Sequence, residues 1–129
     1  MSRVIHFEIH AENPEKVAGF YRELFGWKID KWAGPMDYWT ISTEPATDPG
    51  INGGLVKRMG AAPTQGQAVN AYVCTVGVTD LDASLAKGLA LGAVVAVPKM
   101  PVPGIGWLAY IQDTDGNILG MMQSATGAK

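Results

Sequence analysis

Three polar side chains that could take part in chemistry alternate near the start of the chain. His6, Glu8 and His10 stand two residues apart, with apolar residues between them. Successive side chains of a β-strand point to opposite faces, so this spacing predicts a strand over residues 4–11. One face of that strand would pack on the core, and the other would carry the three polar groups.

His6 and Glu8 are the candidate catalytic pair. Their Cα atoms would lie about 6.6 Å apart along a strand, so the carboxylate could raise the basicity of the imidazole and the pair could move a proton. The same two groups could share a metal ion. His10 would lie about 13 Å from His6, too far for both to bind one ion, and is expected near the rim of the site. A His–Glu pair on a partly solvated sheet can also form a hydrogen bond and have no catalytic role.

The segment after this strand predicts a helix that holds the strand in place. Asn13 is a favourable N-cap, Pro14 suits the first helical position, and Gly26 suits a left-handed C-cap. The remaining elements of this half are expected to be strands at 27–32, 37–42 and 55–58, with a loop at 43–54.

The second half repeats the pattern. A strand at 69–78 precedes a helix that Asp80 caps and Gly92 ends. The later elements are expected to be strands at 93–97, 107–112 and 118–123, a loop at 99–106 and a turn at 113–117.

Landmarks in the two halves recur at nearly constant offsets, which indicates an internal duplication. The matched pairs are Asn13 with Asp80, Gly26 with Gly92, Tyr38 with Trp107, and Gly54 with Gly120. We therefore predict one domain over residues 1–129, with modules at 4–58 and 69–123 and a linker at 59–68.

Composition excludes several classes of protein. The 129 residues are 47% hydrophobic and 17% charged, which excludes a disordered chain, and the net charge of −2 without a basic run argues against nucleic-acid binding. Cys74 is the only cysteine, so neither an intrachain disulfide nor a multi-thiolate zinc site can form. No apolar run is long enough to cross a membrane. We expect a soluble, cytoplasmic protein with no membrane partner.

The sequence resembles the glyoxalase, bleomycin-resistance and extradiol-dioxygenase superfamily, also called the vicinal oxygen chelate superfamily. The resemblance spans about residues 4–123. It is carried by the first strand with His6, by FYRELFGW (20–27), by VTDLDASLAKGLALG (78–92) and by DTDGNILGMMQ (113–123). It implies an α+β, glyoxalase-like fold in which two βαβββ modules curl mixed sheets around a shared cleft. It also implies a homodimer.

The metal-dependent members of this superfamily hold a divalent ion by side chains on the first and last strands of each module. Carried over by position, these ligands fall on His6, near Gly54, near Val73 and on Gly120. Only His6 can bind a metal. We therefore expect no cofactor, with His6 as a ligand only if a divalent metal is present.

The resemblance places several aromatic and sulfur-containing side chains around the cleft. We predict that Tyr38, Trp107, His10 and Met121 contact a ligand, with Tyr38 and Trp107 as a symmetric aromatic pair. Core packing or a dimer contact is the competing interpretation for the aromatic residues. Aromatic walls with a few polar groups suit a flat or apolar small molecule.

Three functions follow from these expectations. The first is binding of a small apolar or aromatic molecule without a metal, as in bleomycin-resistance proteins. The second is a metal-dependent lyase or dioxygenase-type enzyme, which rests on His6. The third is a metal-free isomerase or cyclase that uses His6 and Glu8 for proton transfer.

Overall fold

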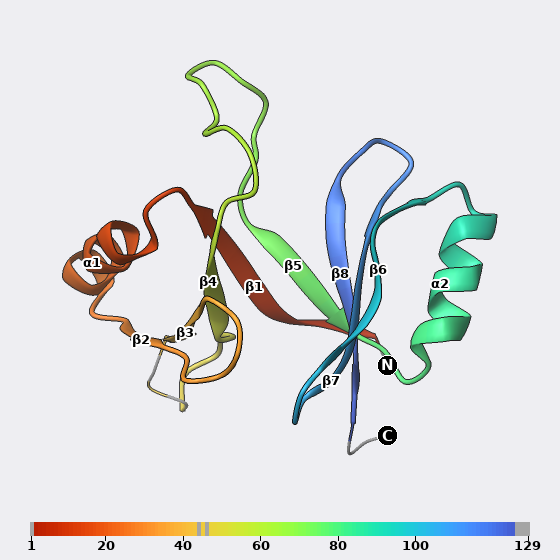
Figure 1. Ribbon diagram of the computed structural model, residues 1–129, viewed down its shortest axis with the longest axis horizontal. Helices are drawn as coiled ribbons and strands as arrows, with labels where there is room; N and C mark the ends of the chain where they lie inside the picture. The colour runs from red at the N-terminus through yellow and green to blue at the C-terminus, as the bar shows by residue number, and fades with distance from the viewer. Residues whose placement is uncertain (1, 44, 46, 126–129) are drawn as a thin grey trace. The chain divides into compact units, whose positions relative to one another are not determined.

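The computed structural model describes residues 2–43, 45 and 47–125 and divides into two compact units. One unit is His6–Tyr72, and the other combines Met1–Ile5 with Val73–Lys129. The first strand passes from one unit to the other between Ile5 and His6. The unit His6–Tyr72 contains one helix and four strands, counting its part of the first strand. The other unit contains one helix, four strands and residues 3–5 of the first strand (Figure 1).

The unit His6–Tyr72 is built on a four-stranded mixed sheet. Its strands lie in the order β2, β3, β4, β1; β1 and β4 run parallel and the other neighbours antiparallel. The elements are β1 (Arg3–Ala11), α1 (Pro14–Phe25), β2 (Lys28–Lys31), β3 (Tyr38–Ser42) and β4 (Gly53–Lys57).

The second unit repeats this arrangement. Its strands lie in the order β5, β8, β7, β6, again with one parallel pair, β5 with β8. The elements are β5 (Val73–Gly77), α2 (Leu81–Ala90), β6 (Val94–Val102), β7 (Gly106–Gln112) and β8 (Ile118–Ser124). Glu8 pairs with Gly54 in the first unit, and Thr75 pairs with Gly120 in the second. The fold is therefore α+β, with the βαβββ order in both halves.

In each unit the helix packs on one side of the sheet, and an apolar cluster is buried there (Figure 1). Beneath α1 the buried cluster is Phe7, Ile9, Ala11, Ala18, Ile29, Trp39, Ile41 and Leu55. Beneath α2 the buried cluster is Leu81, Ala109, Ile111 and Met121. Burial of this apolar surface stabilises each unit by about 25 cal/mol per Å².

The predicted caps of the helices are confirmed. Asn13 accepts a hydrogen bond from the backbone N–H of Lys16, and Gly26 ends α1 with φ 73°. Asp80 accepts from the backbone N–H of Ala83, so both helices begin where the sequence predicted.

Three predicted strand boundaries are wrong. The strand expected at 69–78 begins at Val73. Gly53 and Gly54 belong to β4 rather than to the loop 43–54, because their backbone pairs with both β1 and β3. The strand expected at 93–97 continues to Val102, through what was predicted as the loop 99–106. Prolines are tolerated there because β6 is the last strand in the order of its unit, where one edge needs no hydrogen bonds from a neighbour.

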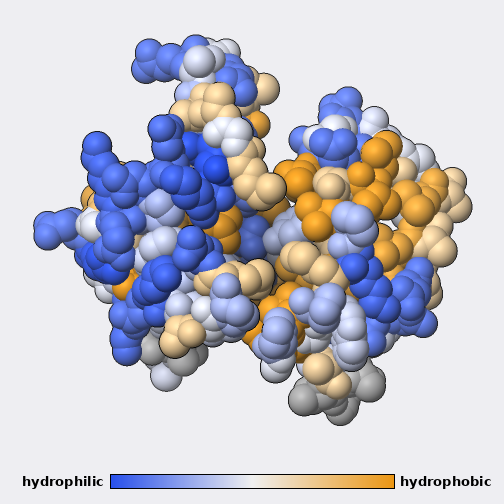
Figure 2. Space-filling view, in the orientation of Figure 1, coloured by the Kyte–Doolittle hydropathy of each residue, from blue (hydrophilic) through white to orange (hydrophobic). Residues whose placement is uncertain are grey.

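The surfaces of the two units differ in polarity. In the view of Figure 2, hydrophilic residues dominate the unit that carries α1, and hydrophobic residues gather on the unit that carries α2. The exposed apolar side chains of α2 and β6 and of the turn between them include Leu89, Leu91, Val94 and Val95. Across the described residues, neither helix has the length and hydropathy that a membrane span requires.

The N-cap of α1 gives a direct test of this fold. Asn13→Ala removes the side-chain acceptor for the N–H of Lys16, and we expect the free energy of unfolding to fall by about 1 kcal/mol. Urea denaturation followed by circular dichroism measures this change. The matched control is Asn70→Ala in the segment before β5, which should leave stability nearly unchanged. An Asn13→Ala variant as stable as the original would show that the cap does not support α1.

Candidate functional site

The face of the first sheet that α1 does not cover is polar on all four strands. Residues paired across neighbouring strands share a face, and positions two apart along one strand do so too. The registers of β1 to β4 therefore place one set of side chains on this uncovered face: His6, Glu8, His10, Tyr38, Thr40, Ser42, Val56, Lys28 and Asp30, with Gly54 among them. The expected face for His6, Glu8 and His10 is confirmed by the core beneath α1, which contains their neighbours Phe7, Ile9 and Ala11.

His6 forms a hydrogen bond with Tyr38, which lies 32 residues away in the chain. The Nε2 atom of His6 and the Oη atom of Tyr38 are 2.9 Å apart, and both residues are half-buried. Burial lowers the pKa of His6 below its ordinary value, while the nearby charge of Glu8 opposes that shift. Burial also raises the pKa of Tyr38, and Glu8 adds to the rise. Near neutral pH, therefore, His6 is uncharged and Tyr38 keeps its proton.

Glu8 is a carboxylate only 8% exposed. Its Oε1 atom lies 3.3 Å from Nε2 of His10, which is half-buried. The two histidines of the strand thus have different partners, since His6 contacts the phenol and His10 the carboxylate. The charge of Glu8 acts on the pKa of His6, and a catalytic role for this pair stays a prediction.

Tyr38 occupies its position because residue 54 has no side chain. A Cβ atom on Gly54 would overlap the hydroxyl and the ring of Tyr38. On its other side, Trp32 packs edge-on against Tyr38, with ring centroids 6.1 Å apart. The phenol is therefore held between an indole, an imidazole and bare backbone.

Sequence reasoning missed this contact between Tyr38, His6 and Gly54. Gly54 was assigned to a loop, so no residue was expected to need the space above it. A Gly-Gly pair at the start of an apolar stretch is one signal that another group approaches the backbone closely.

Two predicted ligand contacts lie on the wrong face of the second sheet. Trp107 and Met121 pack in the cluster beneath α2. Tyr38 and Trp107 are also not equivalent residues of the two units. Tyr38 pairs with Val56, whose equivalent in the second unit is Met122. Met122 pairs with Leu108, so Leu108 is the equivalent of Tyr38. Because side chains alternate along a strand, this difference of one residue moves Trp107 to the opposite face.

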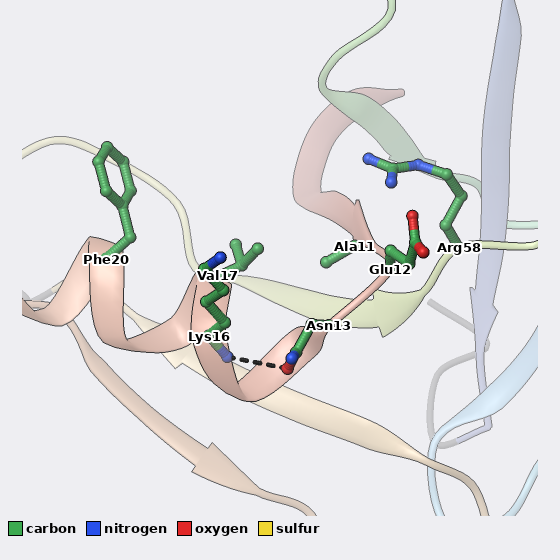
Figure 3. Close-up of a pocket in the computed structure, with 7 residues that line it drawn as sticks. All are labelled: Ala11, Glu12, Asn13, Lys16, Val17, Phe20 and Arg58. Carbon is green, nitrogen blue, oxygen red and sulfur yellow. Dashed lines mark hydrogen bonds between the residues drawn. The ribbon is translucent and has the colours of Figure 1, made fainter. Parts of the chain in front are cut away.

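A groove lies on the other side of the first sheet, where α1 begins (Figure 3). It measures about 500 Å³ and is lined by Ala11, Glu12, Asn13, Lys16, Val17, Phe20 and Arg58. Ala11 belongs to the core beneath α1. The groove is thus distinct from the polar face that carries His6 and Tyr38.

The residues present do not fit the divalent metal that the sequence resemblance implies. At the Gly54 position, Tyr38 fills the space that a ligand side chain would need, and at Gly120 an added Cβ would lie 2.9 Å from Oγ1 of Thr75. Nε2 of His6 is engaged by Tyr38. No group of three or more His, Cys, Asp or Glu side chains able to hold an ion occurs among residues 2–43, 45 and 47–125.

The close contact between Gly54 and Tyr38 predicts a coupling between the two positions. Gly54→Ala should lower the free energy of unfolding by about 1–3 kcal/mol, because the new methyl group overlaps the phenol. The loss should persist with Tyr38→Phe, whose ring remains in the way, and shrink with Tyr38→Ala, which clears the space. Urea denaturation of the single and double variants measures this coupling. Equal losses in all three backgrounds would show that the phenol does not occupy this space.

The buried imidazole predicts a pH dependence of stability. The pKa of His6 is lowered in the folded chain, so between that value and 6.5 the unfolded chain binds more protons. The free energy of unfolding should therefore fall as the pH drops through this window. Urea denaturation at about pH 8 and about pH 5 measures the fall. His6→Gln should reduce it, and an unchanged pH dependence in His6→Gln would contradict the lowered pKa.

Comparisons with known proteins yield matches to structures and none to sequences. No protein-family model matches the chain, and no curated protein sequence matches it significantly. Among solved structures, a hypothetical protein from Bacillus halodurans C-125 is 11% identical with a TM-score of 0.68, over 99% of this chain and 98% of that one.

Two epimerases have TM-scores close to that of the Bacillus halodurans protein. A methylmalonyl-CoA epimerase variant from Streptomyces coelicolor, in complex with 2-nitronate-propionyl-CoA, is 17% identical with a TM-score of 0.67, over 96% of this chain and 95% of that one. The methylmalonyl-CoA epimerase from Mycobacterium tuberculosis is 12% identical with a TM-score of 0.67, over 95% of this chain and 87% of that one. These identities establish the fold alone. The chain has the glyoxalase-like α+β fold of these epimerases.

Proposed function

We propose that the protein binds a small organic molecule on the polar face of β1 to β4, without a metal at the superfamily positions. The observation that carries this proposal is the hydrogen bond between His6 and Tyr38 on a sheet face that its own helix leaves uncovered. The ligand is a flat molecule with a polar group. Tyr38 and Trp32 offer aromatic surface, and His6 and His10 offer hydrogen bonds.

The first reason for this proposal is the arrangement of polar groups. A binding site combines apolar surface with a small number of fixed polar groups that set the orientation of the ligand. Tyr38 is fixed by Trp32 and by the backbone of Gly54, and it in turn holds His6. A ligand would thus meet side chains that are already ordered, so little conformational entropy is lost on binding.

The second reason is the poor fit of a divalent ion, which shifts the proposal away from a metal-dependent lyase or dioxygenase. His6 remains the residue that a metal would contact if one were bound. A stoichiometric divalent ion that is lost in His6→Ala would revive that alternative.

A metal-free isomerase or cyclase is the second candidate, and Glu8 favours it. A carboxylate this deeply buried, beside two imidazoles, can exchange protons with a bound molecule. Two solved methylmalonyl-CoA epimerases with the same fold are in complex with 2-nitronate-propionyl-CoA and with methylmalonyl-CoA. Loss of turnover in Glu8→Gln, with ligand affinity nearly intact, would favour this candidate.

The homodimer and the cytoplasmic location expected from the sequence stay predictions. The same holds for the absence of nucleic-acid and membrane partners. Analytical ultracentrifugation of the full chain tests the dimer.

Binding is tested with a panel of small aromatic carbonyl compounds, such as benzamide and acetophenone, by saturation-transfer NMR and calorimetry in the presence of EDTA. We expect saturable binding of at least one compound. Tyr38→Phe and His6→Ala should each weaken it by roughly 2- to 10-fold, the value of one hydrogen bond.

The matched control is Tyr21→Phe, which removes a phenol from α1 on the other side of the same sheet and should leave affinity unchanged. If no member of the panel binds, or if Tyr21→Phe weakens binding as much as Tyr38→Phe does, the proposed site is wrong.

A further inference from the structure

The hydrogen bond between His6 and Tyr38 has a direction, and that direction decides what His6 can do. A neutral imidazole carries one N–H donor and one acceptor nitrogen, and a phenol can either donate or accept. The 2.9 Å separation of Nε2 and Oη is compatible with both arrangements. They differ in which nitrogen of His6 remains for a ligand.

The relative acid and base strengths of the two groups favour the phenol as donor. A phenol has an ordinary pKa near 10 and donates readily, whereas its oxygen is a weak base. The unprotonated nitrogen of a neutral imidazole is a stronger base, with an ordinary pKa near 6.5. Near pH 8, an imidazole and a phenol of ordinary pKa are both in the required protonation state.

We propose that Tyr38 is a positioning residue that donates its hydroxyl hydrogen to Nε2 of His6 and thereby holds the imidazole as the Nδ1–H tautomer. The residues around it hold the phenol in place. Tyr38 lies against Gly54 and Trp32, so its Oη atom stays beside Nε2 of His6. In a histidine, the hydrogen bond made by one ring nitrogen sets the protonation of the other.

Nδ1 of His6 is then the atom that faces a ligand. Tyr38 is the hydrogen-bond partner of His6 among the described residues, and it uses Nε2. No buried side-chain nitrogen or oxygen in the described part of the chain lacks a partner. Nδ1 is therefore not fully buried, and as Nδ1–H it is a donor.

This tautomer selects the chemistry of the ligand, a step that rests on the proposed function. An Nδ1–H donor recognises an acceptor such as a carbonyl oxygen. The buried carboxylate of Glu8, on the same face, disfavours an anionic acceptor and so favours a neutral carbonyl or amide. The lone pair of Nε2, which a metal ion or a proton-transfer step would need, is occupied by Tyr38.

The tautomer is measured by nitrogen NMR of the uniformly ¹⁵N-labelled, untagged full chain at about pH 8, where an imidazole of ordinary pKa is neutral. The chain has two histidines, so the spectrum contains two rings. His6→Gln removes one of them and assigns both. Protonated and unprotonated ring nitrogens differ strongly in chemical shift, and their couplings to the ring hydrogens identify Nδ1 and Nε2.

We expect the His6 ring of the unaltered protein to show a protonated Nδ1 and an unprotonated Nε2. In Tyr38→Phe the ring should shift toward the Nε2–H tautomer and its pKa should change, while the His10 ring stays as it was. Tyr21→Phe, on the opposite side of the sheet, should alter neither ring.

Two results would overturn the proposal. One is an Nε2–H tautomer in the unaltered protein, which needs no variant to observe. The other is an Nδ1–H ring that persists unchanged in Tyr38→Phe. The spectrum requires no ligand, so its outcome is separate from that of the binding panel, and either proposal can fail without the other.

Discussion

The contact that the candidate site depends on is the hydrogen bond between His6 on β1 and Tyr38 on β3, made above the bare backbone of Gly54 on β4. Three strands must be in register for this contact to exist, because β4 lies between the other two. A side chain at residue 54 would displace the phenol. The absence of a Cβ there is therefore a requirement of the site, and the contact links the pairing of the strands to the chemistry of one imidazole.

The same contact bears on whether a divalent ion can bind at His6. In a metal site, the lone pair of a histidine nitrogen is shared with the ion. Here the hydroxyl of Tyr38 lies where that ion would have to approach Nε2 of His6. A neutral phenol and a neutral imidazole stabilise each other by one hydrogen bond and need no further charged ligands around them. Glu8 is left as the buried charge of the face, with His10 beside it.

Much of the fold could be predicted from the sequence because it follows from local rules. The alternation of residues 4–11 and the caps Asn13, Gly26 and Asp80 depend on neighbours close in the chain. The boundaries that were wrong depend on pairing with distant strands. The residues next to Gly54 in the chain predict a loop. Gly54 lies in a strand because its backbone pairs with β1 and β3.

The site, too, could be predicted only where it depends on residues close in the chain. Which face His6 points to could be predicted, since period two decides it. Its partner could not, because Tyr38 is 32 residues away and the contact depends on the empty space at Gly54. Trp107 was misplaced for a related reason: the offset between the two halves differs by one residue in this strand, and a one-residue shift reverses the face.

The central claim is that Tyr38, and not a metal ion, engages Nε2 of His6. A crystal structure of the untagged protein grown with added Ni²⁺, with data collected at the nickel absorption edge, tests it most directly. The account predicts Oη of Tyr38 within hydrogen-bond distance of Nε2 and no anomalous peak beside His6. An ion about 2.1 Å from Nε2, with Tyr38 displaced from Gly54, would contradict it.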